Sequence, residues 1–338
     1  MDAFVCTGPG QIEYREIGIP RLRPGHAIIK IRRIGICGTD IHAIQGSQPY
    51  FQYPRILGHE LAADFVEADG LCDFVPGEAL TFIPYFHCGR CLPCLSGKPN
   101  CCTSLKVSGV HQDGGMTEFF TVPIHSLLHS EGLNYDELAL VEPLSIGAHA
   151  IRRSQIKENE SLLIMGAGPI GIACIEFGLL AGARVMVMEQ NEERLSFCRR
   201  ISGPEMVLDT RDDKAEEKIL DMTRGNMPDV VMDATGNLQA IQKGFDFMSH
   251  GGKYVLVGLQ KDLIGFSHPE FHKREATLMS SRNATKQDFL IVMDAIRQKK
   301  IHPLRMINHI SAFKNIERDF KDWMDPAKGI IKAMVYAD

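Results

Sequence analysis

Two clusters of potential metal ligands lie in the first third of the chain. The first begins at Cys37-Gly38-Thr39-Asp40-Ile41-His42 and closes with His59-Glu60. Zinc prefers sulfur and imidazole ligands, and a catalytic zinc takes three protein ligands and keeps a fourth position for water or substrate. Cys37 and His59 are therefore expected to hold a catalytic metal. Taken alone, the same residues would also fit a small buried cysteine and ordinary loop histidines.

The second cluster consists of cysteines only. Cys88, Cys91, Cys94 and Cys102 are spaced C-x2-C-x2-C-x7-C. Four thiolates close a tetrahedron around zinc and leave no open position, which is typical of a structural site. Cys101 is an alternative fourth ligand on spacing alone, and four cysteines would also fit an iron–sulfur cluster, although nothing else in the chain suggests electron transfer.

Composition limits the class of protein. The 338 residues exceed what one hydrophobic core usually supports, so two domains are expected. The balance of 37 basic against 42 acidic residues, net −5, gives no support to nucleic-acid binding. Ten cysteines behind an N-terminus without a secretory pattern predict a reducing, cytoplasmic location. A membrane span could be drawn over residues 162–188, but a strand, a turn and a helix fit its five glycines better.

The first part of the chain, to about residue 125, is expected to be rich in β-strands. Short apolar runs at 27–31 and 118–122 are bounded by glycine and proline turns. This pattern favours an antiparallel barrel or sandwich. The metal-ligand clusters fall between such runs, on loops, where functional groups are commonly placed.

A nucleotide-binding pattern follows. Pro143 suits the first position of a helix, and the apolar strand 161–165 then runs into Gly166-Ala167-Gly168-Pro169-Ile170-Gly171. A helix to about residue 181 and a strand over 184–188 come next, ending in Glu189. Glu189 follows Gly166 by 23 positions, close to the ~20 expected for the acid that binds the ribose hydroxyls of a dinucleotide. This context predicts dinucleotide binding, with an empty fold of the same type as the alternative.

Further strand–helix units predict a doubly wound parallel sheet. Strands are expected over 229–232 and 253–257, and the residues after them, Thr235 and Gly258, should line the cofactor crevice. From about 275 the alternation stops. The segment 277–283 is expected to return to the first domain as a strand, followed by a helix over 286–299 and a short tail. The predicted domains are 1–144 with 275–338, and 145–274.

The motifs together resemble one family. G-I-C-G-T-D-I-H, G-H-E, the four cysteines, V-E-P, G-A-G-P-I-G and D-A-T-G occur in the order found in zinc-containing medium-chain dehydrogenases, which include alcohol, sorbitol and threonine dehydrogenases. The resemblance covers essentially the whole chain. It implies a GroES-like catalytic domain, a Rossmann NAD domain, two zinc ions per chain and an active site in the cleft between the domains. It also favours Cys102, because the family's fourth structural cysteine comes eight residues after the third.

The resemblance also implies roles for individual residues. Cys37 and His59 would hold the catalytic zinc, with Glu142 at the position where polyol dehydrogenases have a carboxylate and simple alcohol dehydrogenases a cysteine. Glu60 would be a second carboxylate, bound directly or through water. Thr39 would take the alcohol proton, His42 would pass it on through the cofactor ribose, and Asp40 would accept a hydrogen bond from His59. The expected cofactor-binding residues are Gly166, Gly168, Pro169, Ile170, Gly171, Glu189, Arg194, Thr235 and Gly258.

Within the family the chain is most similar to bacterial polyol and sugar-acid dehydrogenases, in particular L-galactonate and L-gulonate 5-dehydrogenases. This similarity rests on residues 53–60, 109–115 and 271–273, and on Ser281-Arg282-Asn283. The resemblance implies a secondary alcohol of a sugar acid or polyol as the substrate, and a homodimer or homotetramer. NAD is expected rather than NADP, because Glu189 would repel a 2′-phosphate and the next two residues, Gln190 and Asn191, are neutral. The expected substrate residues are Gln48, His111, Arg282 and Asn283.

Other readings remain. The substrate could be a different alcohol or threonine, or the fold could work without a catalytic metal, as in quinone reductases. A non-catalytic NAD-binding regulator would have no use for the proton relay of Thr39 and His42. A zinc-ribbon nucleic-acid module would need two C-x2-C pairs about 15–20 residues apart, which is not the spacing over 88–102.

Overall fold

The computed structural model describes residues 1–201 and 203–337 and divides into two compact units. One comprises Met1–Pro143 with Thr285–Asp338, and the other is Leu144–Ala284. The first unit is discontinuous because the second is inserted into it. One boundary falls inside the helix α3 (Tyr135–Ser154), and the other lies between Ala284 and Thr285.

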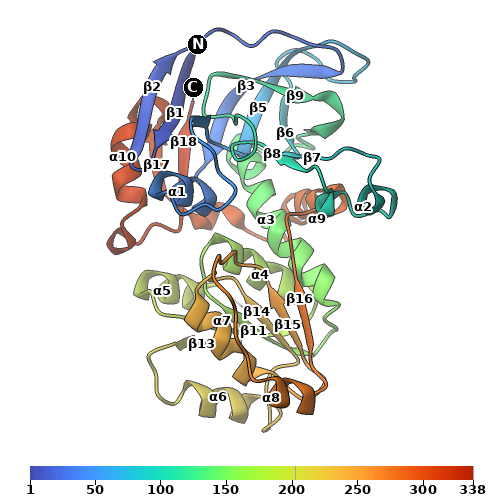
Figure 1. Cartoon of the computed structure of the whole chain (residues 1–338), viewed down its shortest axis with the longest axis vertical. Coiled ribbons are helices and arrows are strands. Elements are labelled where there is room, and N and C mark those ends of the chain that lie inside the picture. The colour runs from blue at the N-terminus through green and yellow to red at the C-terminus, as the bar shows by residue number, and fades with distance from the viewer. Residues whose placement is uncertain (202, 338) are drawn as a thin grey trace. The chain divides into compact units, whose positions relative to one another are not determined.

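The first unit is built on a seven-stranded sheet with the order β10-β6-β5-β3-β18-β17 and with β9 paired to β3 (Figure 1). Its pairs are antiparallel except for β17 and β18, which are parallel. A three-stranded sheet β2-β1-β4 and the two-stranded β7-β8 complete it. The strands are β1 (Asp2–Gly8), β2 (Gln11–Glu16), β3 (His26–Gly35), β4 (Arg55–Ile56), β5 (Glu60–Ala68), β6 (Ala79–Phe82), β7 (Tyr85–Phe86), β8 (Lys106–Val107), β9 (Phe119–Pro123), β10 (Leu127–His129), β17 (Ile307–Ala312) and β18 (Lys332–Tyr336).

One apolar cluster forms the core of this unit. Ile29 and Ile31 of β3, Leu61 of β5 and Val335 of β18 are each at most 1% exposed. Strands from both ends of the chain thus contribute to the same core, and the expected short tail after residue 299 is instead two strands and a helix. The helices of the unit, besides the first part of α3, are α1 (Gly38–Gln45), α2 (Leu92–Leu95), α9 (Lys286–Arg297) and α10 (Ile316–Trp323).

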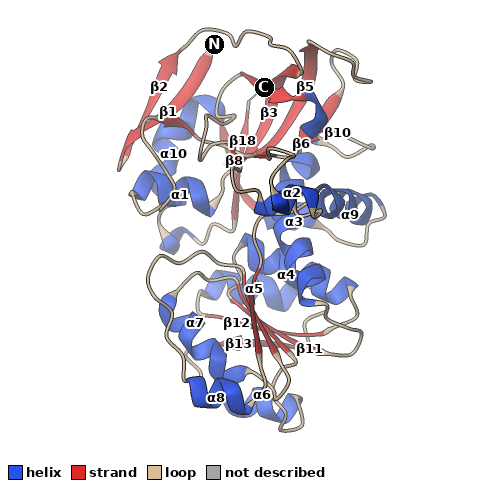
Figure 2. Ribbon diagram, turned by 45° about the vertical axis from the view of Figure 1, so that its right-hand side comes forward, coloured by secondary structure: helices blue, strands red, loops and turns tan. Residues whose placement is uncertain are grey.

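The second unit is a six-stranded parallel sheet with the order β13-β12-β11-β14-β15-β16, flanked by helices on both sides (Figure 2). This is the strand order of a dinucleotide-binding fold. Because both faces are covered, residues 162–165 of β11 are a continuous buried apolar run. The elements are β11 (Ser161–Met165), α4 (Pro169–Leu180), β12 (Arg184–Glu189), α5 (Glu192–Arg200), β13 (Met206–Asp209), α6 (Ala215–Met222), β14 (Val230–Asp233), α7 (Leu238–Gly244), β15 (Lys253–Leu256), α8 (His268–Lys273) and β16 (Thr277–Ser280).

The structure differs from the sequence-based expectation at β16. The segment is a strand, but it pairs in parallel with β15 as the sixth strand of the nucleotide-type sheet and does not return to the first unit. The segment between β15 and β16 forms no long α-helix, and the six residues of α8 are its α-helical part. The expected alternation was therefore hidden by a short and exposed helix.

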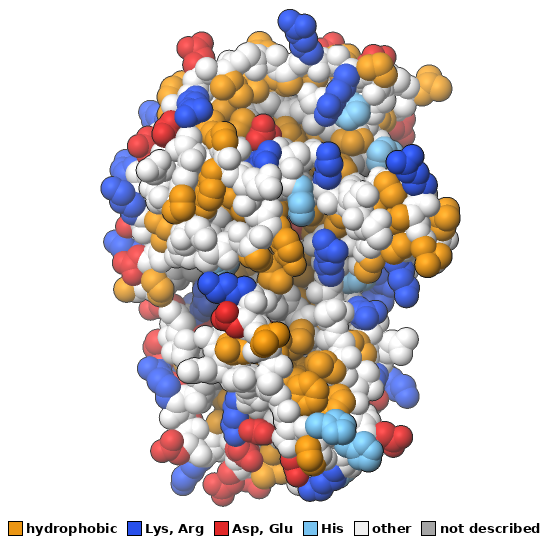
Figure 3. Space-filling view, viewed as in Figure 1, with side chains coloured by type: hydrophobic (Ala, Val, Ile, Leu, Met, Phe, Trp, Pro, Cys, Tyr) orange, Lys and Arg blue, Asp and Glu red, His pale blue; other side chains and the backbone are white. Residues whose placement is uncertain are grey.

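Residues 162–188 form β11, α4 and most of β12 rather than one long helix. Among the helices in the described part of the chain, none combines the length and the apolar character that crossing a membrane requires. Basic, acidic and hydrophobic side chains all occur over the face of the molecule drawn in Figure 3.

The glycine-rich turn after β11 leaves no room for a side chain at Gly171. Gly166 has φ +92°, and a Cβ built on Gly171 would lie 1.9 Å from the carbonyl oxygen of Gly166. The turn and the first turn of α4 are therefore in direct backbone contact.

We predict that Gly171→Ala lowers the free energy of unfolding of the second unit by about 1–3 kcal/mol or more, because the backbone must shift to admit the methyl group. Gly265→Ala is the matched control, since a Cβ there would meet only the Gln242 amide at 3.7 Å. Urea unfolding of both variants measures the difference. Equal stability of the two variants would contradict the close contact.

Candidate active site

The four cysteines gather around one point of the loop that carries α2. Their sulfur atoms all lie within 4.8 Å of one another. Cys91 precedes α2, Cys94 lies within it, and Cys102 accepts backbone N–H groups from Cys88 and Ser104. Backbone hydrogen bonds from Cys94 and Thr103 lower the pKa of the Cys91 thiol to about 6, which favours the thiolate. Cys101 is exposed and outside the group. The closed set of four sulfurs fits a structural zinc.

A second, mixed group forms where the first strand–helix turn meets β5. Ligand atoms of Cys37, His59 and Glu60 lie within 4.8 Å of one another. Cys37 is the N-cap of α1, and His59 and Glu60 are 4% and 1% exposed at the start of β5. The strand register holds Cys37 close to His59 and Glu60, because Gly35 of β3, two positions before Cys37, pairs with Glu60. A thiol, an imidazole and a carboxylate in one buried place fit zinc.

Lys332 is a member of this site that the sequence reasoning missed. Its Nζ lies 2.6 and 2.8 Å from the two carboxylate oxygens of Glu60 and donates to the carbonyl oxygen of Ile36 at 3.1 Å. Lys332 and Glu60 are each 1% exposed. Burial alone would lower the pKa of Lys332, but Glu60 and Cys37 outweigh it and the net shift is upward. A lone lysine near residue 330 carries no motif, so only the strand pairing of β18 with β3 reveals it.

Glu142 enters the same buried region from α3. Its Oε1 accepts a hydrogen bond from the hydroxyl of Tyr85, whose ring packs edge-on against Phe289. Burial raises the pKa of Glu142 to about 7, partly offset by His59. The expectation that Pro143 begins a helix is wrong, because α3 begins at Tyr135 and Pro143 lies inside it. The reciprocal hydrogen bonds of Asn134 and Glu137 form a capping box that marks the true start.

Asp40 supports the site differently from what was expected. Its carboxylate accepts the N–H of Cys37 at 3.0 Å and that of Gly58 at 3.3 Å, so it ties the two metal-ligand segments together. The Nδ1 atom of His59 lies 3.9 Å from Asp40, beyond hydrogen-bond distance. This Nδ1 is buried and has no hydrogen-bond partner among residues 1–201 and 203–337.

The charge balance of the region calls for a cation. The region combines three buried carboxyl groups and a thiol with two buried basic side chains. The acidic groups belong to Asp40, Glu60, Glu142 and Cys37, and the basic ones to Lys332 and His59. Burial raises the pKa of Asp40 as well as that of Glu142, because ionised carboxylates are costly to desolvate. A divalent cation coordinated here would offset that cost. The residues therefore fit a zinc ion on charge as well as on ligand type.

Thr39 and His42 lie on one side of α1, three positions apart, directly after Cys37. The N–H of Thr39 donates to the Cys37 sulfur at 3.4 Å. His42 is exposed, and its Nδ1 lies 2.9 Å from the hydroxyl oxygen of Ser47. The two residues thus run from the metal-ligand cysteine toward solvent.

The expected substrate residues fall into two separate groups. In the first unit, His111 stacks with Tyr50, and the side-chain oxygen of Gln48 accepts the N–H of Tyr50 at 3.1 Å. Tyr50 was not predicted and carried no motif. In the second unit, Arg282 and Asn283 follow β16. Asn283 has φ +50°, and its buried Nδ2 has no hydrogen-bond partner in the described part of the chain.

The nucleotide-type turn brings several of the expected cofactor residues together. Glu189 accepts the N–H of Ala167 at 2.7 Å, and those of Gln190 and Asn191 at 2.7 and 2.9 Å. A guanidinium nitrogen of Arg194 lies 3.9 Å from the Glu189 carboxylate.

The ends of the neighbouring strands meet around a buried acid that the sequence analysis did not assign. A Cβ on Gly166 would lie 2.7 Å from Thr235, and one on Gly258 would lie 2.8 Å from the carboxylate of Asp233. That carboxylate accepts the N–H groups of Thr235 and Gly236. Gly168 caps α4, whose first residues are Pro169 and Ile170.

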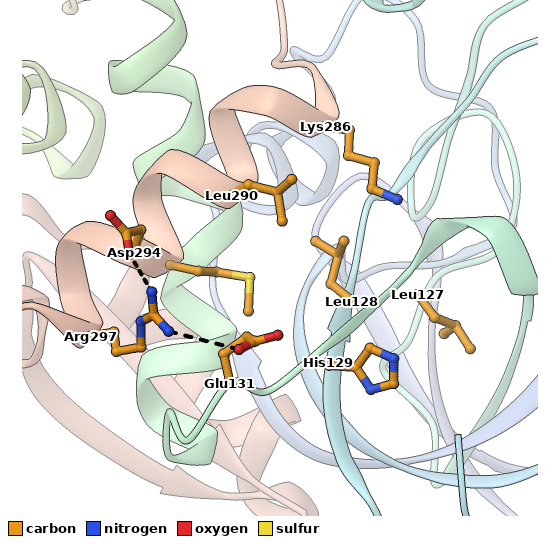
Figure 4. Close-up of a pocket in the computed structure, with 9 residues that line it drawn as sticks. Leu127, Leu128, His129, Glu131, Lys286, Leu290, Asp294 and Arg297 are labelled. Carbon is orange, nitrogen blue, oxygen red and sulfur yellow. Dashed lines mark hydrogen bonds and ion pairs between the residues drawn. The ribbon is translucent and has the colours of Figure 1, made fainter. Parts of the chain in front are cut away.

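A cavity of about 500 Å³ lies elsewhere in the first unit, between β10 and α9 (Figure 4). Three leucines, Leu127, Leu128 and Leu290, are among its lining residues. The lining residue Arg297 is bonded to Asp294 and lies 4.0 Å from Glu131. It contains none of the expected site residues, so the metal-ligand groups are the better candidate for chemistry.

We predict that Lys332→Met lowers the free energy of unfolding by about 3–5 kcal/mol, because Glu60 is left as an uncompensated buried charge. Lys328→Met is the matched control, since Lys328 pairs with Asp322 at the surface and such pairs contribute about 1 kcal/mol or less. Urea titration of both variants provides the comparison. A similar small loss in both would show that the Lys332–Glu60 pair has little weight.

Two family profiles match this chain. The alcohol dehydrogenase GroES-like domain matches residues 23–131, and the zinc-binding dehydrogenase domain matches residues 169–298. The chain is 38% identical over 337 residues to L-galactonate-5-dehydrogenase of Escherichia coli (strain K12), with 98% of each chain covered.

Solved structures share the fold over nearly the whole length. An alcohol dehydrogenase (rspB) from E. coli CFT073, complexed with NADH, has a TM-score of 0.92 at 27% identity and covers 100% of this chain and 99% of its own. A zinc-binding dehydrogenase from Sinorhizobium meliloti 1021, bound to NADP, has a TM-score of 0.91 at 27% identity, with 99% of both chains covered. The chain therefore belongs to the zinc-type medium-chain alcohol dehydrogenase family, as an NAD(P)-dependent oxidoreductase of polyol or sugar-acid CH–OH groups.

Proposed function

We propose that the protein oxidises a secondary alcohol of a sugar acid to the ketone, with L-galactonate or L-gulonate as the best matched substrates and NAD as the acceptor. The strongest support is the 38% identity, over 98% of each chain, to a relative named L-galactonate-5-dehydrogenase. The carboxylates Glu60 and Glu142 also make the mixed metal site richer in oxygen than a site with two cysteines. Expected homo-oligomer formation and a cytoplasmic location remain predictions.

The ligand types of the two metal sites suit two zinc ions with different roles. Cys88, Cys91, Cys94 and Cys102 would hold a structural ion, and Cys37 and His59 with Glu60 or Glu142 a catalytic one. When bound, zinc would supply Lewis-acid polarisation of the substrate hydroxyl, and NAD would accept the hydride.

The protein's own contribution is to move the proton. Thr39 would accept the proton of the reacting hydroxyl, and His42 would pass it on toward solvent, since an imidazole can act as a proton shuttle. Ser47, 2.9 Å from Nδ1 of His42, would keep the ring in place. Asp40 would hold the Cys37 and Gly58 segments at a fixed spacing.

We predict different losses when the two metal sites are removed. Cys91→Ser should reduce the zinc content from two ions to one per chain and lower the melting temperature, because a structural zinc contributes directly to folding. His59→Ala should leave the fold intact and abolish turnover. Elemental analysis, circular dichroism and NAD reduction measure these outcomes. A single zinc in the wild type, together with normal turnover in His59→Ala, would reject the assignment.

We also propose a preference for NAD over NADP, because a 2′-phosphate would meet the buried carboxylate of Glu189. Removing that like-charge repulsion should shift the NADP/NAD ratio of kcat/KM by about 10- to 100-fold toward NADP. Glu189→Ser removes the side chain and frees Arg194, while Glu189→Gln removes the charge and retains a hydrogen-bond acceptor for the backbone N–H groups.

Comparable changes of the ratio in both variants would assign the preference to charge. If the wild type used both cofactors equally well, Glu189 would have no selective role.

A substrate panel tests the proposed reaction. The wild type should reduce NAD with L-galactonate or L-gulonate more efficiently than with ethanol or threonine. In the proposal Arg282 holds the substrate carboxylate through two parallel hydrogen bonds. Arg282→Leu should then lower kcat/KM for the hexonate by roughly a hundred- to a few thousand-fold, the equivalent of ~3–5 kcal/mol.

The loss with an uncharged hexitol, and the change in NAD affinity, should both be much smaller. A wild type that prefers ethanol or threonine to every hexonate and hexitol would reject the substrate assignment and leave the dehydrogenase family membership untouched.

A further inference from the structure

A second cavity lies in the first unit and is separate from the metal-ligand groups. Its volume is about 470 Å³, which is within the usual range of small-molecule sites. One wall is the irregular segment 17–23, another is Ile56 with residues 112–114, and a third is the start of β9, residues 119–121. Among the described residues that line it, none is a metal-ligand, cofactor or substrate residue of the proposed function.

Hydrogen bonds hold the backbone of all three walls in place. Ile17 exchanges two backbone hydrogen bonds with Met1, and at the other end of the segment the carbonyl oxygen of Arg23 accepts a backbone N–H at 3.1 Å. On the second wall, Gly114 donates its N–H to the carbonyl oxygen of Ile56 at 2.8 Å. Strand β9 pairs with β3 along its whole length. The cavity is therefore a preformed feature of the fold, as small-molecule sites usually are.

The charges around the cavity leave two cations without partners. Arg21 and Arg23 are exposed, and neither guanidinium has a hydrogen-bond or ion-pair partner in the described part of the chain. Asp113 is the one acid among the described lining residues. Its carboxylate already accepts the N–H of Ile56 at 3.1 Å and lies 3.5 Å from a guanidinium nitrogen of Arg55. The cavity therefore has an excess of positive charge, which attracts an anion.

The polar groups of the cavity suit the oxygen atoms of a carboxylate or a phosphate. Guanidinium groups bind such oxygens through parallel N–H donors, and two arginines, Arg21 and Arg23, line this one cavity. The hydroxyl oxygen of Thr121, another lining residue, is buried and has no hydrogen-bond partner within residues 1–201 and 203–337. Buried hydroxyl groups in native proteins are nearly always bonded, so this one is open to a bound ligand.

We propose that this cavity binds a small organic anion, with its carboxylate or phosphate group on the guanidinium groups of Arg21 and Arg23 and its apolar body against Ile17 and Phe119. The combination of cationic and apolar side chains favours a ligand with a charged end and an apolar end. A sugar acid fits less well, because its hydroxyl groups would face the apolar part. The inference does not depend on the proposed reaction or on its substrate.

Binding is measured with the zinc-loaded enzyme at saturating NADH, so that the nucleotide-binding turn is occupied. The two anionic probes are phenyl phosphate and benzoate. Inorganic phosphate lacks the apolar body of the first probe, and benzamide lacks the charge of the second. Titration calorimetry gives the dissociation constants, and the methyl NMR signals of Ile17 and Ile56, which both line the cavity, report where each probe binds.

Removing the two cations should weaken the binding of both anionic probes. We expect a loss of roughly 10- to 100-fold in Arg21→Gln/Arg23→Gln, the size expected for charge-assisted hydrogen bonds. Arg305→Gln/Lys314→Gln is the matched control, because it removes the same charge from two other exposed residues of the first unit, and it should bind as the wild type. Thr121→Val should weaken binding by about 2- to 13-fold, the loss expected for one hydrogen bond.

The two counterparts should bind more weakly than the probes, because inorganic phosphate buries no apolar surface and benzamide forms no charged pair. Equal affinity of the double arginine variant and its matched control overturns the inference, as does benzamide binding as tightly as benzoate. Unchanged methyl signals of Ile17 and Ile56 with both anionic probes also overturn it. Circular dichroism of each variant confirms that the fold is retained.

Discussion

The buried ion pair between Lys332 and Glu60 is the constraint on which the rest of the first unit depends. A carboxylate that is 1% exposed is tolerated only with a close partner, and the partner is supplied by a strand 272 residues further along the chain. The pairing of β18 with β3, and of β3 with β5, places the ammonium group at the carboxylate. The same strand pairing fixes Cys37 and His59, because β3 leads into one and β5 follows the other. The sheet register that brings Lys332 to Glu60 therefore also sets the geometry of the metal site.

Much of the second unit could be predicted from sequence, because its signals are local. The strand 161–165, the glycine-rich turn and the acid at Glu189 lie within one strand–helix–strand unit, and the strand after residue 183 was expected within one residue of its observed end. The four-cysteine group has the same local character: its spacing predicted that Cys88, Cys91 and Cys94 would meet a fourth cysteine, and the family resemblance favoured Cys102 over Cys101, as the structure has it. Patterns of this kind depend on neighbours in the sequence.

The sequence-based predictions were wrong or incomplete where a feature depends on distant segments of the chain, or where a local signal was misleading. Lys332 has no motif and acquires its role only from strand pairing. Pro143 resembles a helix start, but packing sustains α3 through it, and the capping box at Asn134 and Glu137 was the signal that should have been weighed. The strand β16 was assigned to the wrong sheet, because α8 is too short and too exposed to show helical periodicity.

The separation of Glu60 and Lys332 also has a consequence for synthesis on the ribosome. At a translation rate of roughly 5–20 residues per second, the lysine is made about 14 to 54 s after the carboxylate, with the whole nucleotide-type unit produced in between. During that interval the nascent N-terminal segment carries acidic and thiol ligands without their ammonium counter-ion, and the seven-stranded sheet lacks two of its strands. The metal site can therefore reach its final geometry only after Lys332 has been made, 272 residues after Glu60.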